Sequence, residues 1–196
     1  MDATLHVILG TGPVGVWTAR AAGARYVSID NLYGYGRFSG TLTERAALNP
    51  NTRKGRLRAA MTRDVLGAHA RGDVRAAILQ SADYYGPGVT ASQFGARTFP
   101  PMLAGKPADI AGSASMPHSY AYIEDVGRAA AVLGTRDEAL GRVWFAPHAP
   151  AITQRAMIEE ACRQLGVPPR ARAWRCSTSS PSHSSCHRRR SNSPSA

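Results

Sequence analysis

Three glycines at a fixed spacing near the N-terminus constrain the fold more than any other feature of this sequence. Gly10, Gly12 and Gly15 directly follow the apolar residues 5–9 and lead into the alanine-rich residues 14–24. The first glycine permits a tight turn, the second lets a diphosphate approach the backbone, and the third lets a helix pack closely on the strand. The pattern therefore predicts a buried parallel strand, a turn, and a helix whose first N–H groups can bind phosphate.

The residues expected to hold a dinucleotide are those of the turn itself: Gly10, Thr11, Gly12, Pro13, Val14 and Gly15. The alternative interpretation is a tight turn between a strand and a helix with no ligand. Asp30 lies 20 positions after Gly10, at the end of a second predicted strand, residues 26–30. An acidic residue about 20 positions after the first glycine commonly binds the ribose hydroxyls of NAD. Spacing alone therefore assigns Asp30 to the ribose.

The rest of the chain alternates between short apolar runs and segments with helical periodicity, which is typical of an α/β protein. The segment 31–50 is predicted to be a loop because it contains several glycines and a proline. Further strands are predicted at residues 74–79, 119–123 and 142–145, and helices at residues 54–70, 92–103, 124–133 and 153–165. No run of 18 apolar residues occurs, so we expect no membrane-spanning helix.

The charge and composition change abruptly near the C-terminus. The formal net charge is +11, and no acidic residue follows Glu160. Residues 176–196 contain nine serines, two prolines and the run Arg188–Arg190, with no large apolar side chain. Such a composition cannot bury a core, so residues 1–168 are predicted to form the folded domain and residues 169–196 a disordered basic tail. About half of the excess positive charge belongs to this tail.

The cysteines indicate neither a disulfide framework nor a metal site. The chain has three cysteines, an odd and sparse number, so cytoplasmic residence is the default expectation. A zinc site built from Cys176, His183, Cys186 and His187 is the alternative, but their spacing matches no compact ligand pattern. No metal is therefore expected.

Four segments, in order, resemble the extended short-chain dehydrogenases/reductases, the NAD(P)-dependent epimerase/dehydratase family. Residues 10–15 resemble the first cofactor loop, and residues 26–36 resemble the family's fifth strand with its S-S-x-x-V-Y-G end. Residues 81–88 (SADYYGPG) resemble R-x-x-N-V-Y-G-P-G, and residues 120–127 (YAYIEDVG) resemble F-I-H-V-D-D-V-A. The resemblance implies a Rossmann-like doubly wound parallel sheet, NAD or NADP as cofactor, and a small C-terminal substrate-side region.

The resemblance also implies that the sheet is truncated. The family's second, third and fourth strands have no counterpart here, so roughly 60 to 90 residues are missing after Arg20. On this alignment Asp30 belongs to the fifth strand, near the reaction site, and does not bind the ribose. We prefer the alignment to the spacing, because a spacing of 20 arises easily by chance whereas residues 26–36 match a composite motif.

The family's catalytic residues are replaced. Its Ser/Thr falls on Asn31, and its Tyr-x-x-x-Lys falls on Thr52 and Arg56, whose side chains cannot exchange a proton near neutral pH. The nearby candidates are Asn31, Tyr33, Tyr35 and Lys54. The alternative to a catalytic role is a structural one, in which the tyrosine rings pack against other side chains and Lys54 is a solvated residue at the start of a helix. The residue types favour this structural role.

Three functions follow from these observations. The leading hypothesis is an NAD(P)-binding epimerase/dehydratase-like protein that acts on a sugar nucleotide or related small molecule, with its activity in doubt. The second is a non-catalytic remnant that binds no nucleotide. The third is a basic nucleic-acid-binding protein that uses the arginine tail, which no aromatic interleaving or recognition motif supports.

Overall fold

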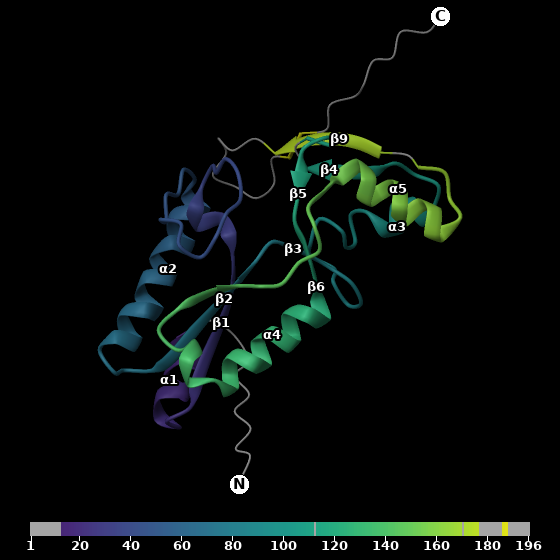
Figure 1. The fold of residues 1–196 in the computed structure, drawn as a ribbon. Helices are drawn as coiled ribbons and strands as arrows, with labels where there is room; N and C mark the ends of the chain where they lie inside the picture. The colour runs from purple at the N-terminus through teal and green to yellow at the C-terminus, as the bar shows by residue number, and fades with distance from the viewer. Residues whose placement is uncertain (1–12, 112, 170, 177–185, 188–196) are drawn as a thin grey trace, which may run out of the picture. The chain divides into compact units, whose positions relative to one another are not determined.

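The computed structural model describes residues 13–111, 113–169, 171–176 and 186–187 (Figure 1). The chain divides into two compact units. Unit 1 comprises residues 1–82 and 124–147, and unit 2 comprises residues 83–123 and 148–196. Among the described residues, none of the helices is both long enough and apolar enough to cross a membrane.

Unit 1 is built on a parallel sheet of three strands. The strand order is β1 (Arg25–Asn31), β2 (Arg75–Ser81) and β7 (Val143–Phe145), with β2 in the middle. The strands predicted at residues 26–30, 74–79 and 142–145 are thus confirmed, and they lie in one parallel sheet. The predicted strand at residues 5–9 lies outside the described residues.

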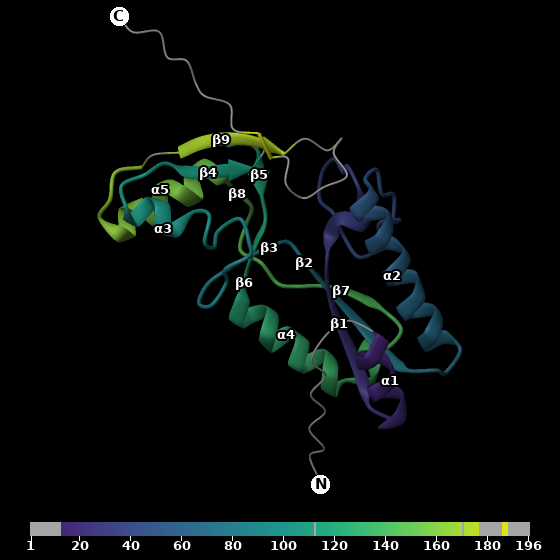
Figure 2. The ribbon, with the colours of Figure 1, turned by 180° about the vertical axis from the view of Figure 1, so that it is seen from behind.

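Helices occupy both faces of this sheet. α2 follows β1 along the chain and shares a buried cluster with it, in which Val65 and Ala68 pack on Tyr26 and Ala76. On the other face, Gly134 of α4 approaches Val27, whose side chain points away from α2. The arrangement is therefore the predicted α/β order of helix, sheet and helix (Figures 1 and 2). The helical elements of unit 1 are α1 (Pro13–Ala21), η1 (Leu32–Tyr35), α2 (Arg53–Ala70), α4 (Ile123–Thr135) and η2 (Asp137–Ala139).

A buried polar chain connects β2 to the segment after β1 and to α2. The Tyr35 hydroxyl donates a hydrogen bond to Gln80 Oε1 at 2.8 Å, and Gln80 Nε2 donates to Thr62 Oγ1 at 3.2 Å. Gln80 is almost fully buried, so both ends of its amide need these partners. These two hydrogen bonds fix the position of η1 relative to the sheet.

Unit 2 is assembled from short strands around one helix-covered cluster. β3 pairs with β6 in parallel, β5 pairs with β8 antiparallel, and β4 lies beside β9, which also pairs with β10. The elements are β3 (Asp83–Tyr85), α3 (Phe99–Leu103), β4 (Ala108–Ala111), β5 (Pro117–His118), β6 (Tyr120–Tyr122), β8 (Ile152–Thr153), α5 (Gln154–Leu165), β9 (Ala171–Cys176) and β10 (Cys186–His187).

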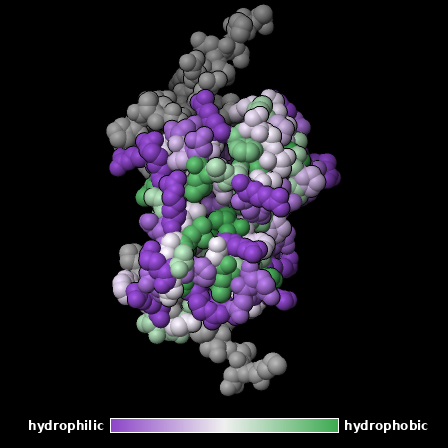
Figure 3. Space-filling model, turned by 60° about the vertical axis from the view of Figure 1, so that its left-hand side comes forward, coloured by the Kyte–Doolittle hydropathy of each residue, from purple (hydrophilic) through white to green (hydrophobic). Residues whose placement is uncertain are grey.

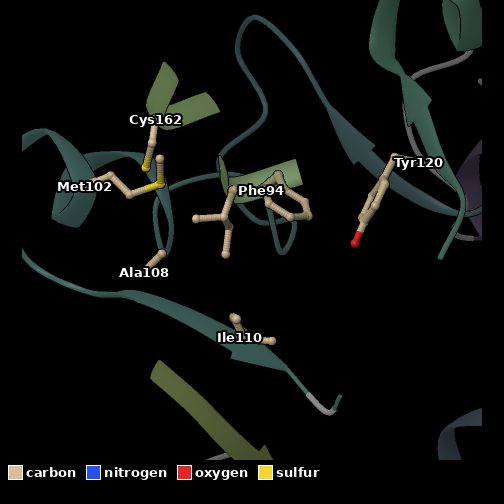
Figure 4. Packing of buried hydrophobic residues seen from close by; sticks show 7 residues of the cluster. Phe94, Met102, Ala108, Ile110, Tyr120 and Cys162 are labelled. Carbon is tan, nitrogen blue, oxygen red and sulfur yellow. The ribbon is translucent and has the colours of Figure 1, made fainter. Parts of the chain in front are cut away.

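The core of unit 2 is an apolar cluster under α5 (Figure 4). Its buried members are Phe94, Met102, Ala108, Ile110, Tyr120, Ile158 and Cys162. α5 begins where the sequence predicts, because the Thr153 hydroxyl accepts a hydrogen bond from the Ala156 N–H. It ends at Gly166, whose left-handed φ of 66° suits a helix C-terminus.

Two expectations for this region differ from the structure. The helix predicted over residues 92–103 is wrong for residues 92–98, which form turns. Pro100 and Pro101 have no N–H to donate, so they fit only in a first helical turn, and α3 accordingly begins at Phe99. Within the segment 169–196, predicted to be disordered, residues 171–176 and 186–187 are in strands β9 and β10. The rest of that segment, apart from residue 169, lies outside the described residues.

The buried polar chain yields a stability prediction. Replacing Tyr35→Phe leaves Gln80 Oε1 buried without its donor, so the free energy of unfolding should fall by about 1 to 3 kcal/mol. Tyr85→Phe, which removes the same atom at a partly exposed tyrosine, is the matched control and should change it by less than about 0.5 kcal/mol. Urea denaturation measures both, and equal effects of the two variants would contradict the structural role of Tyr35.

Candidate functional site

The candidate residues gather where β1 ends. In parallel α/β sheets, ligands bind outside the carboxyl ends of the strands, so this is the expected place for a site. Asn31 is the last residue of β1, and its side-chain oxygen accepts a hydrogen bond from the Tyr33 N–H at 3.0 Å. The Asn31 amide thereby caps η1, the short helix that carries Tyr33 and Tyr35.

Tyr33 and Lys54 come together although they are 21 positions apart in the sequence. The Lys54 ammonium lies 4.6 Å from the centroid of the Tyr33 ring, on the exposed surface of unit 1. Tyr33 is 47% exposed, so a ligand can reach its side chain. Of the sequence-predicted candidates, these two form a cationic and phenolic pair that is accessible to solvent.

Tyr35 has a different environment. Its ring is buried edge-on to Phe145, with 5.6 Å between the ring centroids. Burial, helped by the negative charge of Glu44, raises the pKa of the Tyr35 hydroxyl to about 12. The hydroxyl stays protonated at neutral pH and is engaged with Gln80. The contacts of Tyr35 therefore favour a packing role over proton transfer.

Thr52 and Arg56, at the positions of the family's Tyr and Lys, belong to the start of α2. The Thr52 hydroxyl accepts a hydrogen bond from the Gly55 N–H at 3.0 Å and is the N-cap of the helix. A Cβ at Gly55 would lie 2.5 Å from the Tyr33 carbonyl oxygen, so only glycine allows α2 to start this close to η1. The close packing of Gly55 against η1 is what brings Lys54 to Tyr33.

Asp30 is buried on the α2 face of the sheet. Its Oδ1 lies 3.1 Å from Arg58 Nη1, and only 5% of the Asp30 side chain is exposed. Burial raises the pKa of this carboxyl, although the Asn31 N–H and the Arg58 guanidinium act in the opposite direction. The Asp30 carboxylate is therefore held beside Arg58. Its assignment to a ribose stays a prediction, because residues 10–12 of the cofactor loop lie outside the described residues.

The glycine motif is described only in part. Residues 10–12 lie outside the described residues, whereas Pro13, Val14 and Gly15 form the first turn of α1. The described end of the motif therefore lies in a helix. The first turn is accessible, since Val14 is 80% exposed. In the part of the chain that the structure describes, no cluster of three metal-ligating side chains occurs.

Unit 2 contains a pair that sequence reasoning missed. The Asp83 carboxylate accepts a hydrogen bond from His118 Nε2 at 3.0 Å, and the two side chains are 39% and 43% exposed. The pairing of β3 with β6 places Asp83 opposite Tyr120, so two of the recognised motifs lie side by side. Asp83 and His118 are 35 positions apart, so no local pattern could reveal their contact.

Comparisons with known proteins find structural likeness without sequence matches. No family model matches the chain, and no curated protein matches it. Among solved structures, UDP-glucuronic acid 4-epimerase from Bacillus cereus in complex with NAD has a TM-score of 0.70 at 20% identity and covers 82% of this chain and 53% of its own. The chain therefore spans about half the length of that enzyme.

Two further structures give the same result. MoeE5 in complex with UDP-glucose and NAD has a TM-score of 0.70 at 22% identity, with 82% of this chain and 56% of its own covered. The dTDP-glucose 4,6-dehydratase DesIV from Streptomyces venezuelae has a TM-score of 0.64 at 20% identity, and the match covers 81% of this chain and 50% of DesIV. The chain has a Rossmann-like α/β fold similar to that of these structures, and it spans about half of their length.

The buried carboxyl yields a prediction for pH. Because the pKa of Asp30 is raised, the folded chain binds the Asp30 proton more readily than the unfolded chain does. Asp30 therefore lowers stability as the pH rises above about 4. Between about pH 4 and about pH 7, the free energy of unfolding of Asp30→Asn should fall less, or rise more, than that of the parent. Denaturation series across this range measure the difference, and parallel curves would contradict the burial of a charged carboxylate.

Proposed function

We propose that this chain binds NAD or NADP through residues 10–15 and a sugar nucleotide or related small molecule beside it. The observation that carries the proposal is that Pro13, Val14 and Gly15, the described end of the glycine motif, lie in a helix. A helix that starts inside the glycine motif can present its first N–H groups to a diphosphate, and this requires only local geometry. The described part of the motif thus fits a dinucleotide.

The fold supports the same proposal. The similar structures named above contain NAD, and their names specify sugar-nucleotide epimerases or dehydratases, or include a bound sugar nucleotide. The carboxyl end of β1, where Asn31 and Tyr33 lie, is the edge at which such folds bind ligands. We expect the adenosine half of the dinucleotide to be held weakly. The family's second strand, which borders the adenosine ribose, has no counterpart in this sequence.

The chain's own residues restrict what it can catalyse. A bound nicotinamide would supply hydride transfer. Tyr33, just after the end of β1, is 47% exposed, and the Lys54 charge over its ring can stabilise negative charge that develops there during proton transfer. Thr52 is engaged as a helix cap and Tyr35 stays protonated. We therefore propose that turnover is slow, with Tyr33 as the residue that holds the proton.

The competing proposal is a remnant that keeps the fold and binds no nucleotide. The replacement of the catalytic pair by Thr52 and Arg56 favours it. A role in nucleic-acid binding rests only on the basic segment 169–196, so we place the partners among small molecules. We also propose that the protein acts in the cytoplasm, in keeping with its sparse cysteines.

Isothermal titration calorimetry with NAD⁺ and NADP⁺ tests the proposal. We expect weak, saturable binding to the parent chain and at least about a tenfold loss of affinity in Gly12→Val, because the valine side chain blocks the approach of the diphosphate. Gly127→Val is the matched control, since a Cβ at Gly127 of α4 meets no atom within 4 Å. It should bind as the parent does.

The opposite results are equally clear. If Gly12→Val binds either dinucleotide as well as the parent does, the glycines serve only the turn. If the parent binds neither dinucleotide while its circular dichroism and cooperative unfolding show a folded chain, the remnant hypothesis replaces the proposal.

A further inference from the structure

The helix α2 is strongly basic. Its sequence contains five arginine or lysine residues and one acidic residue, Asp64. Arg58 is paired with the buried Asp30, and the Lys54 ammonium lies over the Tyr33 ring. The other three basic residues of the helix are exposed: Arg53, Arg56 and Arg63.

These three residues form a row on the outward side of α2. The buried residues of the helix are Gly55, Ala59 and Thr62. Because each residue turns the helix by about 100°, the side turned away from them carries the exposed arginines. At about 1.5 Å per residue, the row is about 15 Å long. We call it the arginine row: Arg53, Arg56 and Arg63.

An apolar side chain lies within the arginine row. Leu57 directly follows Arg56 and is 59% exposed. Figure 3 brings forward the side of the molecule on which α2 lies in Figure 1, and hydrophobic areas there are surrounded by hydrophilic side chains. A helix that lies on an anionic membrane needs this combination, because the cations meet lipid phosphates while an apolar side chain enters the boundary below them.

Two of these charges oppose the local preference of a helix. Arg53 and Arg56 lie in the first turn of α2, which contains no acidic residue. The N-terminal end of a helix is positive, so cations are unfavourable there. The Gly55 N–H is already bonded to the Thr52 hydroxyl, so the arginine side chains are the groups that present this charge to the outside. An anionic partner would offset their repulsion from the helix end.

We propose that the arginine row, with Leu57 inserted among the lipids, docks this protein on the surface of a membrane that contains anionic lipids. Nucleic acid is the other common polyanion, and its backbone offers phosphates without an apolar layer to receive Leu57. Docking on a surface requires no membrane-spanning helix. The negative cytoplasmic leaflet matches the location proposed above. The inference is independent of nucleotide binding.

Co-sedimentation of the full chain with lipid vesicles tests the proposal. The parent should bind vesicles of mixed phosphatidylcholine and phosphatidylserine and should not bind vesicles of phosphatidylcholine alone. Salt should weaken the binding, because it screens exposed charges. Equal binding to the two kinds of vesicle, or binding to neither, would overturn the proposal.

A triple variant identifies the surface. Each basic side chain near an anionic leaflet strengthens binding by about fivefold. The variant Arg53→Gln, Arg56→Gln, Arg63→Gln should therefore lose at least about tenfold in affinity for the anionic vesicles. The helix should stay folded, because the changes are exposed and two of them remove unfavourable charge from its first turn. Circular dichroism checks this.

The matched control removes the same charge elsewhere. The variant Arg136→Gln, Arg142→Gln, Arg155→Gln changes three other exposed arginines and should bind within about threefold of the parent. Both variants keep the arginine-rich segment 169–196. Equal losses in the two variants would show that net charge or that segment drives the binding, and this would overturn the assignment to α2.

Leu57 separates a membrane from a soluble polyanion. The variant Leu57→Ser should weaken binding to anionic vesicles by at least about threefold, because it removes the apolar contact. Its binding to a short DNA duplex should equal that of the parent. If Leu57→Ser binds the vesicles as the parent does while the triple variant of the arginine row loses affinity for DNA, the row serves nucleic acid and the proposal is wrong.

Discussion

The parallel ladder between β1 and β2 is the interaction on which the rest of unit 1 depends. It runs without interruption from Arg25 opposite Arg75 to Asn31 opposite Ser81. Because the two strands end together, the turn after β1 and the start of α2 lie at one edge of the sheet. The ladder therefore determines where Asn31 lies, and with it the start of η1, which carries Tyr33 and Tyr35.

The candidate site results from close backbone packing rather than from a sequence motif. Gly55 lets α2 begin against η1, and the polar chain from Tyr35 through Gln80 to Thr62 holds η1 against the sheet. Lys54 lies over Tyr33 as a consequence. Backbone packing of this kind brings a cationic and a phenolic side chain together at the strand end.

Sequence reasoning identified the elements whose signals are local. The strands of the parallel sheet, α2 with its periodic apolar positions, and α5 with Thr153 and Gly166 at its ends all follow from patterns within one segment. Contacts between distant segments have no such signal. The Asp83–His118 pair, the burial of Asp30 beside Arg58 and the Tyr33–Lys54 pair each depend on tertiary packing.

The central claim is that the strand, glycine turn and helix at the N-terminus bind a dinucleotide next to the end of β1. Chemical-shift mapping by NMR during a titration with NAD⁺ tests it most directly, because the method locates the ligand residue by residue. The account predicts shifts concentrated at residues 10–15 and at Asn31 and Tyr33, with Ile110 in the core of unit 2 unaffected. Shifts confined to the arginine-rich segment, or none at saturating NAD⁺, would contradict it.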